Sequence, residues 1–180
     1  MRNLLIAALI CASSVSGLSA QNNSAAARVA AGITLGQDGI SREDAGAIVT
    51  AIERISAHSK RGPVVTKLLD QFEAEARFAM RGDPILRDRL DALGDPTPEL
   101  SVTIAPLSET LSVPPNEGLT SLALPGGSSI KAVTLAGTPV CAPHILDWSC
   151  DPLRAQGELA LDIHASAGGF LVYATKPIAP

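Results

Sequence analysis

The pattern of apolar residues changes its period once along this chain, at the proline-rich break 95–98. Over residues 41–94 the apolar side chains recur every three or four positions, which is the period of an amphipathic helix. Over residues 99–180 they form short, partly alternating runs separated by Gly and Pro, which is typical of strands and turns. We therefore expect an α+β fold in which a three-helix segment precedes a small antiparallel β-sandwich or open barrel.

Local start and stop signals divide the helical segment into three predicted helices. Ser41 and Asp44 have the spacing of a capping box, so we expect the first helix to begin at Ser41. Gly62 and Pro63 separate the first two helices, because glycine suits the residue after a helix and proline its first turn. Asp83 then caps a third, shorter helix. Their apolar stripes are wide for so small a bundle, so we expect them to pack on the strands or to mediate homo-oligomer formation.

The two most strongly alternating runs, 157–165 and 169–175, are predicted to be neighbouring strands. The small residues Ser166, Ala167 and Gly168 lie between them, as in the turn of a β-hairpin. Shorter runs between Gly and Pro turns supply the other strands of the predicted β-rich segment.

The first 20 residues have the layout of a secretory signal peptide. A basic start is followed by the apolar run 4–12 and by small residues up to Ala20. This apolar run is shorter than the about 20 residues that a membrane-spanning helix needs, so no integral membrane span is expected. We expect residues 21–40 to form a flexible tether, and the mature chain to be periplasmic or secreted.

The composition argues against a nucleic-acid partner. The net charge is -4 at pH 7, and aromatic residues make up only 3% of the chain. Nucleic-acid binding requires clustered Lys and Arg, and base stacking requires aromatic faces. We therefore expect a protein partner, in the cell envelope or outside the cell, and no nucleic acid.

Two cysteines, Cys141 and Cys150, follow the predicted leader. In an oxidising compartment, two cysteines this close in sequence are expected to form one disulfide. His144 and Asp147 lie between them, so the alternative is a metal site built from two thiolates and these side chains. The disulfide needs no further ligand, and it is the prediction we adopt.

The loop between these cysteines carries the only tryptophan of the chain. A loop with fixed ends loses little entropy on binding, and tryptophan beside aliphatic residues is typical of protein-contact hot spots. The alternative is that Trp148 turns into the core and the disulfide only fixes a long connection. The candidate binding residues are His144, Ile145, Leu146, Asp147 and Trp148.

An enzymatic function is the alternative hypothesis. Asp162 and His164 lie two apart on a predicted strand, so they share a face. Together with His144 and Asp147 they have the chemistry of a metal-dependent or serine hydrolase, with Ser166 nearby in sequence. The simpler interpretation places Asp162 and His164 on the solvent face of an edge strand. We therefore assign no catalytic residue, no metal ligand and no cofactor.

These observations favour an exported small non-catalytic protein, binding or accessory in role, that acts through protein–protein contact. Its β-rich segment, 99–180, carries the one predicted disulfide and the candidate binding loop. The alternative remains an exported hydrolase that uses His144, Asp147, Asp162 and His164.

Overall fold

The computed structural model describes residues 24–59, 62–93, 101–165 and 169–178. The predicted leader, the proline-rich break 95–98 and the turn 166–168 lie outside the described residues. The described part combines helices with two antiparallel sheets, so the predicted α+β class and its order, helices before strands, are confirmed.

The helices are α1 (Ala25–Ser41), α2 (Ala45–His58), α3 (Pro63–Ala79) and α4 (Pro84–Asp91). The last three are the predicted helices. The tether predicted for 21–40 is wrong over most of its length, because α1 occupies it. Alanine is the strongest helix former, and here an alanine-rich tract that reads as low complexity supplies a helix with a buried face.

The helix starts are set by side-chain caps. The hydroxyl of Ser24 accepts a hydrogen bond from the amide N–H of Ala27 at 3.1 Å. The carboxylate of Asp44 accepts one from the amide N–H of Ala47 at 3.0 Å. The cap predicted at Ser41 is therefore wrong, since Ser41 is the last residue of α1. The prediction failed because the helix that precedes this position was not recognised.

Glycines let α1 pack closely on its neighbours. A Cβ atom at Gly36 would lie 2.5 Å from Cζ and 2.8 Å from Cδ2 of Phe72 in α3. A Cβ atom at Gly39 would lie 2.9 Å from Ile48 Cγ1 in α2. The apolar surface that looked too wide for three helices is thus covered within the chain by α1 and by one face of a sheet.

The strands form two antiparallel sheets rather than a closed barrel. One sheet has the order β1-β9-β3-β7-β6, and the other has the order β2-β8-β4-β5. Their bounds are β1 (Ser101–Pro106), β2 (Thr110–Val113), β3 (Glu117–Ala123), β4 (Ser129–Leu135), β5 (Thr138–Pro139), β6 (Cys141–Pro143), β7 (Trp148–Cys150), β8 (Gly157–His164) and β9 (Phe170–Pro177).

The predicted pairing of the two strongest strands is wrong. Both strands exist, but β8 pairs with β2 and β4, whereas β9 pairs with β1 and β3 in the other sheet. The reason lies in their burial. Strand β8 alternates between buried and exposed residues, while β9 buries Leu171, Val172 and Ala174 and so faces apolar layers on both sides.

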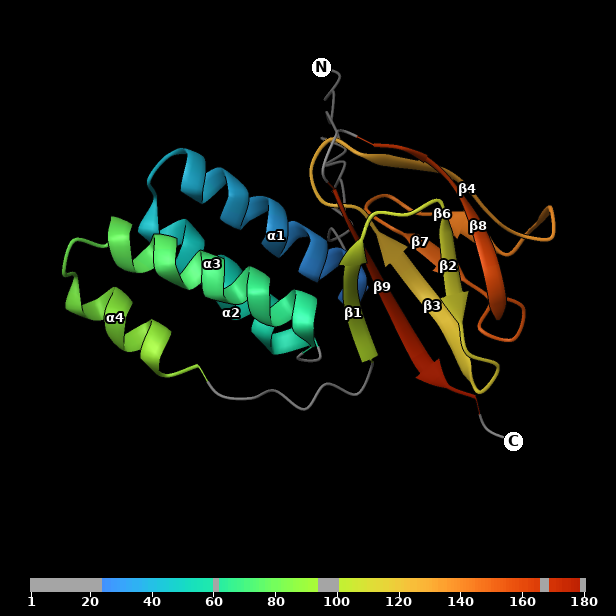
Figure 1. Ribbon diagram of the computed structural model, residues 1–180, viewed down its shortest axis with the longest axis horizontal. Coiled ribbons are helices and arrows are strands. Elements are labelled where there is room, and N and C mark those ends of the chain that lie inside the picture. Colours follow the sequence, from blue (N-terminus) through green and yellow to red (C-terminus); the bar gives the residue numbers. More distant parts are fainter. Residues whose placement is uncertain (1–23, 60–61, 94–100, 166–168, 179–180) are drawn as a thin grey trace, which may run out of the picture.

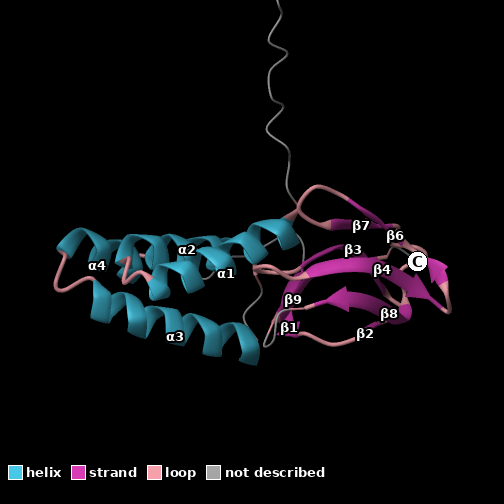
Figure 2. Cartoon of the chain, turned by 90° about the horizontal axis from the view of Figure 1, so that it is seen from above, coloured by secondary structure: helices cyan, strands magenta, loops and turns pink. Residues whose placement is uncertain are grey.

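The β9-containing sheet lies between the helices and the second sheet, and the helices extend away from it to one side (Figures 1 and 2). Val172 and Ala174 join the core beneath the helices, and Leu171 joins the core between the two sheets. Helix α1 also contacts the turn after β3, because the Thr34 hydroxyl accepts a hydrogen bond from the amide N–H of Gly126 at 2.9 Å. This contact places the middle of α1 next to the β3–β4 connection.

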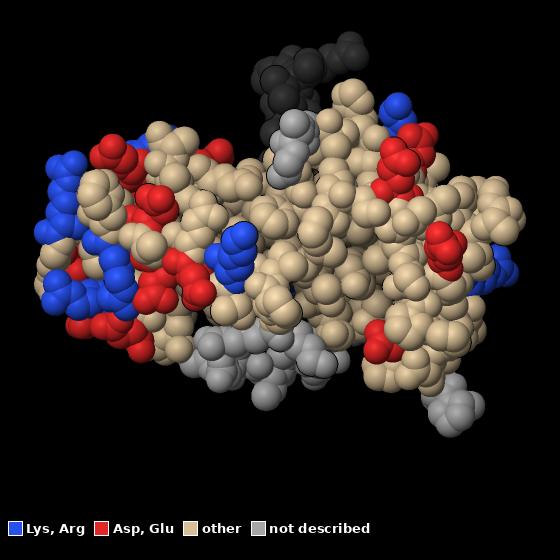
Figure 3. Space-filling model, in the orientation of Figure 1, with Lys and Arg blue, Asp and Glu red and all other residues tan. Residues whose placement is uncertain are grey.

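Charge is distributed unevenly over this architecture. Figure 3 shows that acidic and basic side chains gather over the helices, whereas the sandwich carries fewer of them on the face in view. Within the described ranges, no helix has both the length and the apolar character that crossing a bilayer demands.

Candidate binding site

The β6–β7 hairpin is closed by the predicted disulfide. Cys141 and Cys150 lie directly opposite each other in the antiparallel register, with their Cα atoms 4.0 Å apart, and their sulfurs are bonded. The disulfide prediction is confirmed. The bond joins the two ends of a short hairpin, so the residues between them have little freedom to rearrange.

The turn at the tip of this hairpin combines a polar clamp with two exposed aliphatic side chains. The His144 amide donates to the Asp147 carbonyl at 2.7 Å, and His144 Nδ1 lies 3.5 Å from Asp147 Oδ1. The Asp147 side chain is only 7% exposed, whereas Ile145 and Leu146 are 68% and 58% exposed. The turn thus buries the Asp147 carboxylate, while His144, Ile145 and Leu146 lie at the surface.

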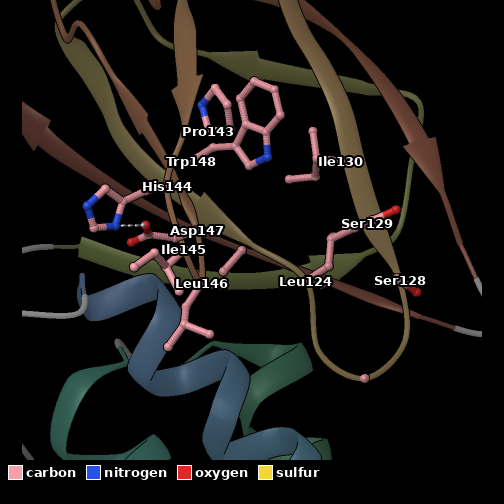
Figure 4. A pocket seen from close by; sticks show the side chains of 12 residues that line it. Leu124, Ser128, Ser129, Ile130, Pro143, His144, Ile145, Leu146, Asp147 and Trp148 are labelled. Carbon is pink, nitrogen blue, oxygen red and sulfur yellow. Dashed lines mark ion pairs between the residues drawn. The ribbon is translucent and has the colours of Figure 1, made fainter. Parts of the chain in front are cut away.

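Trp148 is neither a fully exposed contact residue nor a fully buried core residue, the two alternatives that the sequence left open. It pairs with Pro143 across the hairpin, is half-buried, and packs against the core between the sheets. Figure 4 shows its ring between Pro143 and Ile130 of β4. The indole therefore anchors the hairpin on the sandwich while part of it lines the surface.

A hollow of about 410 Å³ lies beside the hairpin, and two loops form its walls. On one side are the tip and Trp148, and on the other are Leu124, Ser129 and Ile130 around the β3–β4 connection (Figure 4). A second hollow of about 420 Å³ lies between this connection and α1. Leu124 and Leu146 line both hollows, so the exposed Leu146 stands at the boundary between them.

The rival hydrolase residues lie apart. Asp162 and His164 are exposed on β8, as the strand periodicity predicts, but β8 lies between β2 and β4, so the expected edge strand is wrong. His144 and Asp147 lie on the hairpin of the other sheet. Over the described ranges, no three His, Cys, Asp or Glu side chains form a group that could hold a metal ion. Ser166 lies outside the described residues.

Sequence reasoning missed the second wall of the hollow. Leu124, Ser129 and Ile130 flank a predicted Pro-Gly-Gly turn, but no local pattern indicates that this turn faces the hairpin. The one available signal was the apolar Leu124 immediately before the turn, at a position where a polar residue is usual.

Comparison of the chain with protein-family models, curated proteins and solved structures finds no match. The function must therefore be argued from the site. Its exposed aliphatic side chains, Ile145 and Leu146, lie beside a hollow on a turn between disulfide-bonded strands, and His144 Nδ1 faces Asp147 Oδ1 within that turn. Figure 4 shows the Ser129 side chain on the far wall of the hollow from His144, pointing away from it.

Proposed function

We propose that this chain is an exported, non-catalytic binding protein that contacts a protein partner with the tip of the β6–β7 hairpin. The observation that carries the proposal is the exposure of Ile145 and Leu146 on a turn whose ends are joined by a disulfide. Adjacent exposed apolar side chains beside a hollow are typical of a protein-contact surface.

The rigidity of the tip favours binding. The disulfide, the His144–Asp147 pair and the packed Trp148 hold the turn in one conformation before any partner arrives. Such preorganisation reduces the entropy that is lost on association. Burial of the Ile145 and Leu146 side chains against a partner contributes about 2–4 kcal/mol to the binding free energy. This corresponds to about 30- to 700-fold in affinity.

The proposed location outside the cytoplasm rests on two features. The N-terminal 20 residues have the layout of a signal peptide, and disulfides persist in oxidising compartments. A fusion of these residues to a reporter enzyme that is active only after export tests this part. Reporter activity supports export, and an inactive reporter with the leader still attached contradicts it.

The binding role is tested by affinity capture from the native envelope with a double variant, Ile145→Ser with Leu146→Ser. The matched control is Leu153→Ser, because Leu153 is 71% exposed and lies outside the hairpin. We expect the double variant to lose the partner and the control to retain it, with both variants as stable as the wild type. Equal recovery of every captured protein by the wild type and the double variant would contradict the proposal.

A further inference from the structure

The outer edge of β4 is only partly covered. Strand β5 pairs with Thr134 and Leu135, and the Val140 amide donates to the Val133 carbonyl at 3.1 Å. The chain then leaves this edge, since Cys141 begins β6 in the other sheet. Among the described residues, the stretch Ser129 to Ala132 therefore pairs with β8 on one side and with no strand on the other.

The hollow beside the hairpin lies next to the start of this uncovered edge, at Ser129 and Ile130. Ser129 and Ile130 of β4 form one wall, and Pro143 and Trp148 form the other (Figure 4). Ile130 and Trp148 also pack on the core between the sheets, so apolar surface continues from that core into the hollow. The uncovered backbone of Ser129 and Ile130 thus lies next to a hollow whose lining is partly apolar, through Ile130 and Trp148.

An extended peptide has the chemistry that fits this combination. A strand added to a sheet edge satisfies the backbone donors and acceptors, and its alternate side chains point to one face. A helix, by contrast, uses its backbone donors and acceptors internally and would leave this edge unpaired. Four residues of strand span about 13 Å, which is the length of the uncovered stretch.

Lys131 argues against a second copy of the same edge as the occupant. It is exposed and lies at a β-bulge, where the register with β8 shifts between Ile130 and Ala132. Two copies paired along this edge would bring their Lys131 side chains together, and like-charge repulsion disfavours that arrangement. The same lysine favours a peptide that carries an acidic residue opposite it.

We propose that the partner binds through an extended segment that adds antiparallel to β4 along residues 129–132. One apolar side chain of this segment occupies the hollow against Trp148, and an acidic side chain faces Lys131. This proposal rests on the proposed binding role and specifies which part of the partner makes contact.

The test uses acetylated seven-residue peptides of alternating Thr and Val, with Leu, Ile or Phe at the centre and Glu two positions away. Trp148 is the only tryptophan of the chain, so its indole N–H signal in NMR reports directly on the hollow. We expect at least one peptide to shift this signal and the amide signals of residues 129–132 saturably. Absence of any such shift at millimolar peptide would overturn the proposal.

Two controls separate strand addition from apolar adhesion. The first is the same peptide with alternate backbone amides N-methylated, which keeps the side chains but removes hydrogen-bond donors. We expect it to bind about tenfold or more weakly. The second is Lys131→Glu, which should weaken the Glu peptide about two- to fivefold and strengthen a Lys peptide by a similar factor. Equal binding of the N-methylated peptide would exclude strand addition.

Failure of this proposal is distinguishable from failure of the proposed function. If envelope capture depends on Ile145 and Leu146 while no peptide shifts the Trp148 signal, the tip binds a partner in another manner and strand addition is wrong. If peptides bind at β4 while the double variant Ile145→Ser with Leu146→Ser captures every partner as well as the wild type does, the proposed contact at the hairpin tip is wrong. The proposal that the partner adds a strand to β4 then falls with it, because it rests on that contact.

Discussion

Replacement of Gly36 by alanine tests how closely α1 packs on α3. In an exposed helix interior this change stabilises by about 1 kcal/mol, because alanine is the better helix former. At Gly36, however, the new Cβ would lie 2.5 Å from Phe72 Cζ and 2.8 Å from Cδ2, and closer still to Cε2. The ring is only 1% exposed, so it cannot swing into solvent to make room.

The expected result is a net loss of stability. Overpacking of a filled core costs about 1–3 kcal/mol and here outweighs the gain in helix propensity, so we expect Gly36→Ala to lose about 1–2 kcal/mol. The matched control is Gly46→Ala in α2, where the Cβ would meet only Asp44 Oδ1 at 3.4 Å. This control should gain about 0.5 kcal/mol.

Urea unfolding followed by far-ultraviolet circular dichroism measures both changes. A double-mutant cycle with Phe72→Leu completes the test, because removal of the ring should make Gly36→Ala much less costly. If Gly36→Ala is as stable as the wild type, or if its cost is unchanged beside Leu at position 72, the close packing of α1 on α3 is refuted.

Three further predictions concern other contacts. Thr34→Val removes the acceptor of an amide in the β3–β4 connection and should cost about 1 kcal/mol in urea unfolding, while Thr34→Ser should retain most of the stability. Burial, helped by the charge of Arg28, lowers the pKa of His58, so the unfolded chain takes up a proton more readily than the folded one. The free energy of unfolding should therefore be retained above about pH 6.5 and should fall as the pH drops through the lowered pKa of His58. His58→Gln should flatten this part of the plot of unfolding free energy against pH. An unchanged plot would contradict the role given to His58. Replacement of both Cys141 and Cys150 by serine should lower the free energy of unfolding by about 2.5 kcal/mol, and chemical reduction of the wild type should reproduce that loss.

Features with local signals could be predicted from the sequence. Pro63 and Pro84 each begin a helix at the expected position, and Asp83 accepts amides of the first turn of α4. The disulfide could be predicted because Cys141 and Cys150 are close in sequence. In each of these cases the physical cause lies within about ten residues of the effect.

Features that depend on distant contacts could not be predicted. Helix α1 was missed because Ala and Gly residues are ambiguous until their neighbours are known, and Gly36 has its role only because Phe72 packs on it. The separation of β8 and β9 into different sheets depends on the helical layer that covers Val172 and Ala174. The hollow was missed for the same reason, because its walls come from separate strands of both sheets.

The central claim is that the tip of the β6–β7 hairpin is a protein-contact surface, and site-specific photo-crosslinking in the native envelope tests it most directly. A photoreactive phenylalanine derivative is placed at Leu146 or, as the matched exposed control, at Leu153. The account predicts one discrete cross-linked partner from position 146 and none from position 153. Identical cross-linking from both positions, or none from position 146, would contradict it.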